Sequence, residues 1–130
     1  PMPKNQLNRV VCCCDVGMMI LDDVPAFYYG TSPNKFFDYI SSGLPVLNNY
    51  PGWLADLIGE HRCGIAVPPR NAEAFADALC KLADDPQLRL EYGENARRLA
   101  EKEFSRDKLA TQFVDWLEHV YDKRGKKVAS

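Results

Sequence analysis

The chain has 130 residues, of which 46% are hydrophobic and 26% charged, and its formal net charge at pH 7 is −2. This profile is typical of one ordinary soluble domain with enough apolar material for a core. The mild acidity gives no support to nucleic-acid binding, and no apolar run approaches the roughly 20 residues of a membrane span. The sequence has no secretory signal. It begins Pro1-Met2-Pro3 and runs straight into a helix-like segment, so we expect a piece of a longer protein.

Helical and strand patterns alternate over the first half of the chain. In chain order we predict a helix, a strand, a loop, a helix, a strand, a helix and a strand, over residues 4–14, 15–21, 22–29, 34–42, 45–49, 53–60 and 64–67. The first strand is a short apolar run of the kind found in buried parallel sheets. Gly43 follows the second helix at the position where a left-handed residue commonly ends one.

The remaining chain has the pattern of three helices. Asn71, the pair Asp85-Pro86 and Ser105 are suited to begin them. The last helix has an apolar stripe of Leu109, Phe113, Trp116, Leu117 and Val120. Because this spacing is typical of a buried helix face, we predict that the stripe packs in the core. We place the folded domain at residues 1–121 and expect residues 122–130 to form a basic, flexible tail.

Strands that alternate with helices predict an α/β fold with a parallel sheet. Only three strands are recognisable, whereas a complete nucleotide-binding Rossmann sheet has about six. The strand at residues 15–21 would then be an open, apolar edge, and such edges invite association. We therefore expect a homodimer or a strand swap through this edge, unless residues 7–14 or the last helix cover it.

The five cysteines are Cys12, Cys13, Cys14, Cys63 and Cys80. An odd count with an adjacent triplet is not typical of a secreted disulfide framework. The two histidines do not supply the spacing of a metal site. We interpret the cysteines as small buried hydrophobic residues of a protein in the reducing cytoplasm.

The clearest sign of a binding site is the start of the second predicted helix. We expect Ser32 to cap this helix and Pro33 to occupy its first position, which leaves the amides of Asn34 and Lys35 free. Such a helix start attracts anions, because its dipole and its unpaired N–H groups both favour negative charge. Asp38 follows one turn later and suits sugar hydroxyls better than phosphate. A phosphate cradle beside a hydroxyl acceptor suggests a nucleotide-sugar site.

Short motifs occur in a distinctive order along the chain. They are Ser32-Pro-Asn-Lys35, Gly43-Leu-Pro-Val46, Pro51-Gly52, Cys63-Gly-Ile-Ala-Val-Pro-Pro69, Asp84-Asp-Pro86, Gly93-Glu-Asn-Ala-Arg97 and Phe104-Ser105. From Asp15 to Phe113 the sequence resembles the C-terminal, donor-binding domain of family-four GT-B glycosyltransferases, which are of the retaining type. The nearest subgroup is that of bacterial surface-polysaccharide enzymes. Each motif alone is weak, but the ordered set is specific.

The resemblance implies that the three strands are strands four to six of a Rossmann-like GT-B donor domain. It also implies donor binding by Gly30, Thr31, Ser32, Pro33, Asn34, Lys35 and Asp38. Asp38 stands at the second acid of the Glu-x7-Glu motif of the family, which accepts hydrogen bonds from the donor ribose. Gly30 stands at the first acid, so an anchor on the hydroxyls of the transferred sugar is missing, which fits amino- or deoxy-sugars. Gly30 and Thr31 would instead bring backbone amides close to the sugar and phosphate.

The implied reaction is transfer of a sugar from a nucleotide donor, a UDP-sugar, to a glycan or lipid-linked acceptor with retention. The resemblance implies no metal and no other cofactor, because the helix dipole and basic side chains would assist the leaving diphosphate. The first half of the donor domain, the acceptor domain and any acceptor base would precede Pro1. We therefore expect no catalytic residue in the chain, no activity of the chain alone, and an N-terminal part of the same enzyme as its partner. The basic tail could touch the inner face of an anionic membrane.

Two other interpretations remain open. The first is a half-Rossmann domain that binds a nucleotide or a partner without catalysis. The second is a flavodoxin-like or response-regulator domain, which needs five strands. At the site itself, Ser32-Pro33 can be an ordinary helix start, Lys35 a solvated lysine, and Asp38 a charge that the helix dipole favours.

Overall fold

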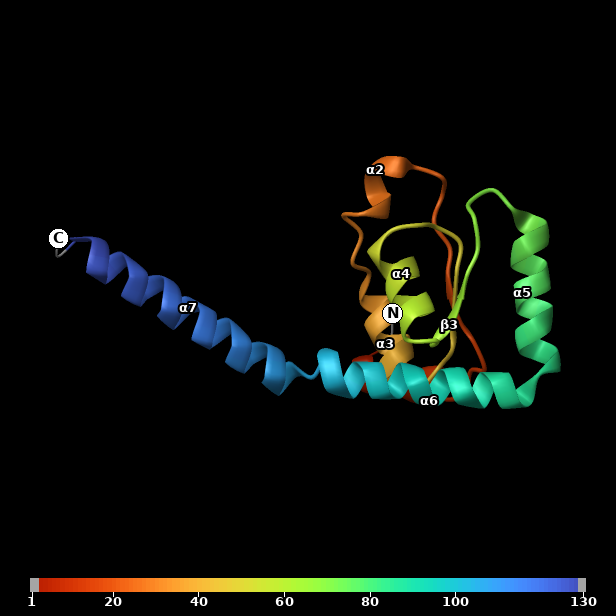
Figure 1. Ribbon diagram of the computed structural model, residues 1–130. Coiled ribbons are helices and arrows are strands. Elements are labelled where there is room, and N and C mark those ends of the chain that lie inside the picture. The colour runs from red at the N-terminus through yellow and green to blue at the C-terminus, as the bar shows by residue number, and fades with distance from the viewer. Residues whose placement is uncertain (1–2, 129–130) are drawn as a thin grey trace.

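A computed structural model describes residues 3–128 and shows seven helices and a three-stranded sheet in this range (Figure 1). In chain order the elements are α1 (Lys4–Val11), β1 (Gly17–Met19), α2 (Pro25–Tyr28), α3 (Asn34–Ser41), β2 (Val46–Asn48), α4 (Trp53–Glu60), β3 (Gly64–Ala66), α5 (Ala72–Asp84), α6 (Pro86–Glu103) and α7 (Arg106–Val128). All three strands are parallel, in the order β1-β2-β3. The predicted α/β fold, with three parallel strands and a helical C-terminal region, is confirmed.

The central strand β2 separates two clusters of buried side chains. Val46 faces the larger cluster, which includes Phe36 of α3 and Ile58 of α4, while Leu47 faces the smaller cluster, which includes Leu82 of α5. This alternation follows from the period of two along a strand. Figure 1 accordingly shows α5 on one side of the sheet and α3 and α4 on the other, with α6 running across one end.

Two glycines allow α6 to approach the end of α3. Gly43 has a φ of +72°, and its amide donates to the carbonyl of Ile40, while the amide of Leu44 donates to that of Tyr39. This is the paired pattern of a Schellman motif, so the predicted helix end at Gly43 is confirmed. A Cβ added at Gly93 of α6 would lie 2.4 Å from the carbonyl oxygen of Gly43. The two helices therefore pack at a distance that only glycine at position 93 permits.

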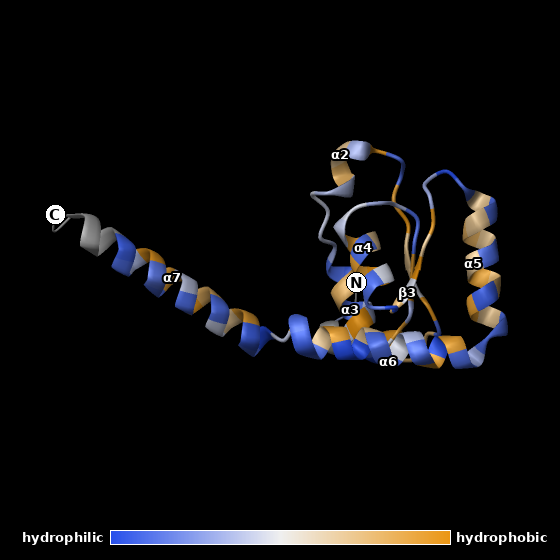
Figure 2. Ribbon diagram, viewed as in Figure 1, coloured by the Kyte–Doolittle hydropathy of each residue, from blue (hydrophilic) through white to orange (hydrophobic). Residues whose placement is uncertain are grey.

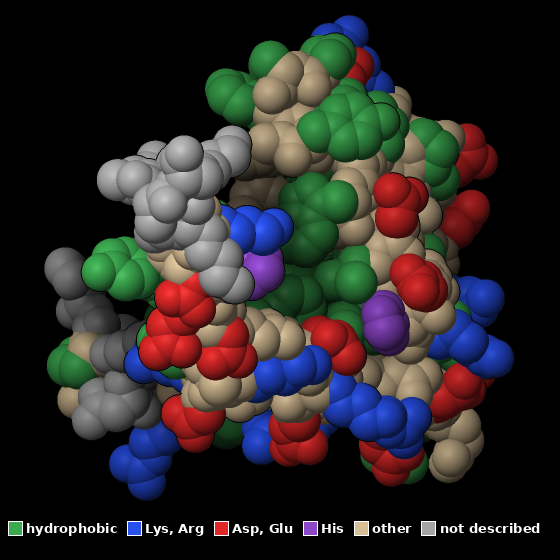
Figure 3. Space-filling model, turned by 60° about the vertical axis from the view of Figure 1, so that its left-hand side comes forward, with side chains coloured by type: hydrophobic (Ala, Val, Ile, Leu, Met, Phe, Trp, Pro, Cys, Tyr) green, Lys and Arg blue, Asp and Glu red, His purple; other side chains and the backbone are tan. Residues whose placement is uncertain are grey.

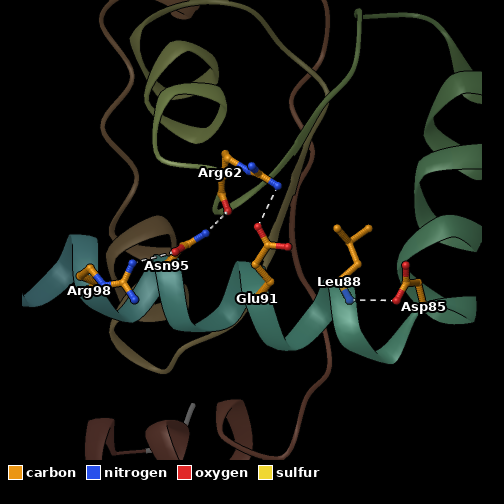
Figure 4. A network of polar contacts seen from close by, with 6 residues as sticks. All are labelled: Arg62, Asp85, Leu88, Glu91, Asn95 and Arg98. Carbon is orange, nitrogen blue, oxygen red and sulfur yellow. Dashed lines mark hydrogen bonds and ion pairs between the residues drawn. The ribbon is translucent and has the colours of Figure 1, made fainter.

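Polar side chains of α6 secure the ends of the helices that it crosses. Asn95 Nδ2 donates to the carbonyl oxygen of Arg62, just past α4, at 3.0 Å, and Glu91 pairs with the Arg62 guanidinium at 2.8 Å (Figure 4). Arg97 donates to the carbonyl of Ser41 at the end of α3. At the other end of α6, Asp85 accepts from the amide of Leu88 at 2.9 Å, as predicted for a helix cap.

The prediction that the apolar stripe of the last helix packs in the core is wrong. α7 leaves the body of the molecule and carries hydrophobic residues along its length (Figures 1 and 2). Phe113 is 59% exposed and Trp116 57% exposed. Their rings stack on each other with centroids 6.0 Å apart. Helical spacing shows that a face can be covered, but it does not show that the chain folds back to cover it.

The backbone of α7 is helical as far as Val128, which includes most of the segment predicted as a tail. Residues 129 and 130 lie outside the described residues. The boundary at residue 121 stays a prediction.

The cysteine interpretation is also wrong in part. Cys63 is fully buried, and burial raises the pKa of its thiol to about 11. Cys12, Cys13, Cys14 and Cys80 are exposed. α1 ends at Val11, three residues earlier than predicted, and the triplet follows it on the surface instead of at a buried helix end.

Candidate functional site

The predicted site lies beyond the carboxyl end of β1. The chain leaves this strand at Met19, forms the single turn of α2 where a loop was predicted, and enters α3 at Asn34. In open α/β sheets, ligands bind outside the carboxyl ends of the strands. The start of α3 therefore occupies a favourable position for a ligand (Figure 1). Asn34 and Lys35 are exposed there, and Asp38 is half-buried.

The cap of α3 differs from the prediction by one residue. Pro33 is the N-cap, with φ −75° and ψ 133°, and no side chain caps the helix, so Ser32 is not the cap and Pro33 is not the first helical residue. The extended ψ of Pro33 moves the helix start to Asn34. The first hydrogen-bonded amide is that of Phe36, which donates to the Pro33 carbonyl at 3.0 Å. The amides of Asn34 and Lys35 thus precede the bonded turn, as the anion-site interpretation requires.

The loop before α3 rests on the start of α4. The indole Nε1 of Trp53 donates to the carbonyl oxygen of Thr31 at 3.1 Å. The amide of Thr31 donates to the carbonyl of Phe27 at 3.1 Å, and the Thr31 hydroxyl donates to the same carbonyl. A Cβ at Gly52 would lie 2.3 Å from the Tyr28 carbonyl oxygen, so the Pro51-Gly52 motif lets α4 begin directly under this loop.

Asp38 lines a cavity of about 370 Å³ between α1, α3, α6 and the start of α7. Asn8, Arg97 and Arg106 contribute polar side chains to the same cavity. The residues of the loop and of the first two helical positions do not line this cavity. Asn34 and Lys35 share one face of α3 with Asp38, because residues three and four apart on a helix are neighbours.

Gly30 is exposed, and a Cβ built on it would meet nothing within 4 Å. Packing in the structure does not require glycine at this position. Thr31 and Pro33 are half-buried, whereas Ser32 is exposed. Of the predicted residues, the structure therefore brings the loop and the helix start together and places Asp38 one turn away from them.

Sequence reasoning missed a cluster beside this loop, consisting of Asp23, Tyr28 and Arg70. Arg70 Nε lies 2.7 Å from Asp23 Oδ2, and the hydroxyl of Tyr28 donates to Asp23 Oδ1. This hydrogen bond is the main cause that raises the pKa of Tyr28 to about 12. In the sequence, Asp23 falls in the loop predicted at residues 22–29 and has no predicted partner. Nothing in the sequence pointed to the distant arginine.

Two further findings concern the described residues. Among residues 3–128, no group of three or more His, Cys, Asp or Glu side chains is placed to hold a metal ion. In the same range, every helix is too short or too polar to cross a membrane.

The chain was compared with known proteins. Residues 31–99, more than half of the chain, match the family model described as glycosyl transferases group 1. The chain is 30% identical over 108 residues to an MMP alpha-(1->4)-mannosyltransferase of Mycolicibacterium hassiacum. It is 31% identical over 101 residues to a D-inositol 3-phosphate glycosyltransferase of Corynebacterium glutamicum. The comparison with solved structures gave no match.

The two alignments include 82% and 74% of this chain but only 25% and 22% of the relatives, so the chain spans about a quarter of their length. The matched family segment runs from the loop at Thr31, through α3, β2, α4, β3 and α5, to Leu99 of α6. The predicted site, apart from Gly30, lies inside it. The chain belongs to the group 1 glycosyltransferases, whose fold is of the GT-B type.

Proposed function

We propose that this chain carries part of the donor site of a glycosyltransferase that uses a nucleotide-sugar. One observation carries the proposal: the start of α3 presents two unbonded amides, with a carboxylate one turn along the same face, inside the segment that matches the family. Amides at a helix start bind phosphate, and a carboxylate accepts hydrogen bonds from sugar hydroxyls. A nucleoside diphosphate offers both groups.

Each predicted residue has a role in this proposal. The amides of Asn34 and Lys35, with the Lys35 ammonium, hold the diphosphate, and Asp38 accepts from the ribose hydroxyls. Ser32 and Pro33 set the entry into the helix. Gly30 and Thr31 pass the backbone close to the phosphate and the transferred sugar, where the open space at Gly30 leaves room for a ligand.

The finer features of the reaction belong to the same proposal. The donor is a UDP-sugar, the acceptor a glycan or a lipid-linked glycan, and the anomeric configuration is retained. Charge on the leaving diphosphate is stabilised by the dipole of α3 and by basic side chains, without a metal. An N-terminal part of the same enzyme supplies the catalytic residues, and the enzyme works in the cytoplasm, at the inner face of the membrane.

A second candidate is a half-domain that binds a partner without catalysis. The exposed β1 edge favours it, because Met18 is 43% exposed and Ile20 just beyond the strand is 59% exposed. A homodimer through this edge is the partner that we propose in that case.

A titration of UDP into the chain, followed by backbone amide chemical shifts, tests the donor site. We expect saturable shifts at residues 31–38 and about a tenfold or greater loss of affinity in Asp38→Asn, because hydrogen bonds to a charged group are worth about 1.5–3 kcal/mol. Asp56→Asn is the matched control, since Asp56 is an exposed helical aspartate of α4. Equal affinity of Asp38→Asn and wild type would exclude the role of Asp38. Absence of binding, both here and after restoring the upstream part of the enzyme, would exclude the site.

A further inference from the structure

The cluster of Asp23, Tyr28 and Arg70 joins two segments that are distant in the sequence. Tyr28 is the last residue of α2, in the segment between β1 and α3, while Arg70 lies between β3 and α5. Asp23 contacts both, with its carboxylate 2.7 Å from Arg70 Nε and accepting from the Tyr28 hydroxyl. The side chain of Asp23 is 25% exposed and that of Arg70 is 75% exposed, so solvent screens the contact from the arginine side and less from the aspartate side.

Contacts continue from this cluster to the start of the proposed donor site. The turn of α2 ends at Tyr28, and the carbonyl of the preceding Phe27 accepts from the Thr31 amide at 3.1 Å. The carbonyl of Thr31 accepts from the Trp53 indole at 3.1 Å. The loop is therefore held by α4 through Trp53, and α2 before it is held to the segment before α5 through the contact of Asp23 with Arg70.

The positive φ of Arg70 indicates that its side chain contributes a contact that offsets an unfavourable backbone conformation. Its φ is +53°, in the left-handed region, which glycine adopts at a lower conformational cost than other residues. At such a position an arginine makes the backbone conformation less favourable than a glycine would. Its observed gain is the contact of its guanidinium with Asp23.

We propose that Asp23 is a positioning residue of the donor site. By holding Tyr28 and Arg70 together, it fixes α2 and thereby the place at which the loop of Gly30 to Pro33 approaches the donor. The inference rests on the proposed donor site, but its effect on the loop exists without a ligand. The two can therefore be tested separately.

Trp53 provides a probe of the loop. The chain has two tryptophans. The Trp53 indole N–H bonds to the Thr31 carbonyl, whereas Trp116 lies on the exposed face of α7. Hydrogen exchange of the Trp53 indole and of the Thr31 amide reports on the position of the loop, and the Trp116 indole is an internal reference.

Arg70→Gly and Arg62→Gly form a matched pair of variants. Both arginines have a positive φ, of 53° and 49°, and each pairs with one carboxylate. The partner of Arg62 is Glu91 of α6, far along the chain from the donor loop (Figure 4). Each glycine variant removes one ion pair and relieves the same backbone strain, so loss of folding does not explain a difference between them.

Without ligand, we expect Arg70→Gly and Asp23→Asn to speed exchange at Thr31 and the Trp53 indole by about fivefold, the size expected for one charged contact that is partly shielded. Both should weaken UDP binding by a similar factor, while Arg62→Gly should change neither and the Trp116 indole should stay constant. Arg70→Lys keeps the positive charge, so it should bind UDP more tightly than Arg70→Gly and less tightly than wild type.

Unchanged exchange in Arg70→Gly and Asp23→Asn would overturn the inference, and so would faster exchange with UDP affinity equal to wild type. Failure of the wild-type protein to bind UDP, both as this chain and after the upstream part of the enzyme is restored, would overturn the proposed function instead. The positioning role would then fall with it, whatever the exchange rates show about the loop.

Discussion

Tyr28 combines a buried ring with a hydroxyl that donates to a carboxylate. Its side chain is 8% exposed, and its hydroxyl donates to Asp23. A neighbouring carboxylate disfavours a phenolate, because two negative charges would then lie side by side. The pKa of Tyr28 is accordingly raised from 10.0 to about 12, with the hydrogen bond to Asp23 as the largest cause.

The raised pKa predicts how stability changes at alkaline pH. Between pH 10 and about 12 the unfolded chain loses the phenolic proton while the folded chain keeps it. The free energy of unfolding therefore falls as the pH rises through this range, and the contribution of Tyr28 is fully present below pH 10. Tyr28→Phe removes this group, so we expect a shallower fall in urea unfolding over the same pH range. Parallel curves for the variant and wild type would contradict the assignment, since Tyr39 and Tyr50 titrate in both.

At the scale of elements, α6 approaches the end of α3 closely at Gly93, in addition to its polar contacts with the ends of α3 and α4. The 2.4 Å between a Cβ at Gly93 and the carbonyl of Gly43 is too short for any real side chain. Because the obstacle is backbone, the helices must separate if residue 93 is enlarged. The loss of stability would therefore come from weaker packing between α3 and α6, and not from a change within α6 itself.

Two helical glycines give a matched prediction. We expect Gly93→Ala to lower the free energy of unfolding by about 1–3 kcal/mol, the usual cost of overpacking. Gly59 of α4 has no atom within 4 Å of an added Cβ, so Gly59→Ala should raise stability by about 0.5–1 kcal/mol through helix propensity. Urea unfolding of both variants measures the difference. A Gly93→Ala variant as stable as wild type would show that α6 adjusts without cost.

Local signals in the sequence predicted most of the elements. Asn71 and Asp85 cap their helices with their own side chains, and Gly43 ends α3, because such preferences depend on a few neighbouring residues. The same reasoning misplaced the cap at Ser32, since a proline fits both the N-cap and the first helical position. It also missed α2, a single turn that carries no periodic pattern.

The site was predictable only in part, for a similar reason. The run from Ser32 to Asp38 is contiguous, so its helix start could be inferred from the sequence. The contact of Asp23 with Arg70 depends on how the chain returns after β3, which no local pattern encodes. The cavity beside Asp38 likewise needs residues from α1, α6 and the start of α7.

At the scale of the whole molecule, a packed body contrasts with a projecting helix. Figure 3 shows the side of the molecule from which α7 projects. Hydrophobic side chains are exposed on this side, above a band of mixed acidic and basic side chains. Phe36 in the core is 0% exposed, whereas Phe113 on α7 is 59% exposed. The same residue type therefore contributes differently to stability in the two places.

This contrast predicts the effect of two identical substitutions. Phe36→Ala should lower the free energy of unfolding by about 3–5 kcal/mol, because it leaves a cavity between α3 and α4. Phe113→Ala should change it by less than about 0.5 kcal/mol, as is usual for a surface position. Thermal and urea unfolding of the two variants tests both values. A comparable loss in Phe113→Ala would mean that the face of α7 is covered in solution.

The contact of α6 with the end of α3 also has a consequence for synthesis on the ribosome. The stretch from Gly43 to Gly93 takes about 3–10 s to make, at the roughly 5–20 residues per second of translation. Throughout that time, the turn at Gly43 and the apolar face of α3 lack the contacts that α6 makes with them in the folded protein. Once Ala66 is translated all three strands are present, and the nascent domain remains without α6, and accessible to chaperones, until that helix emerges.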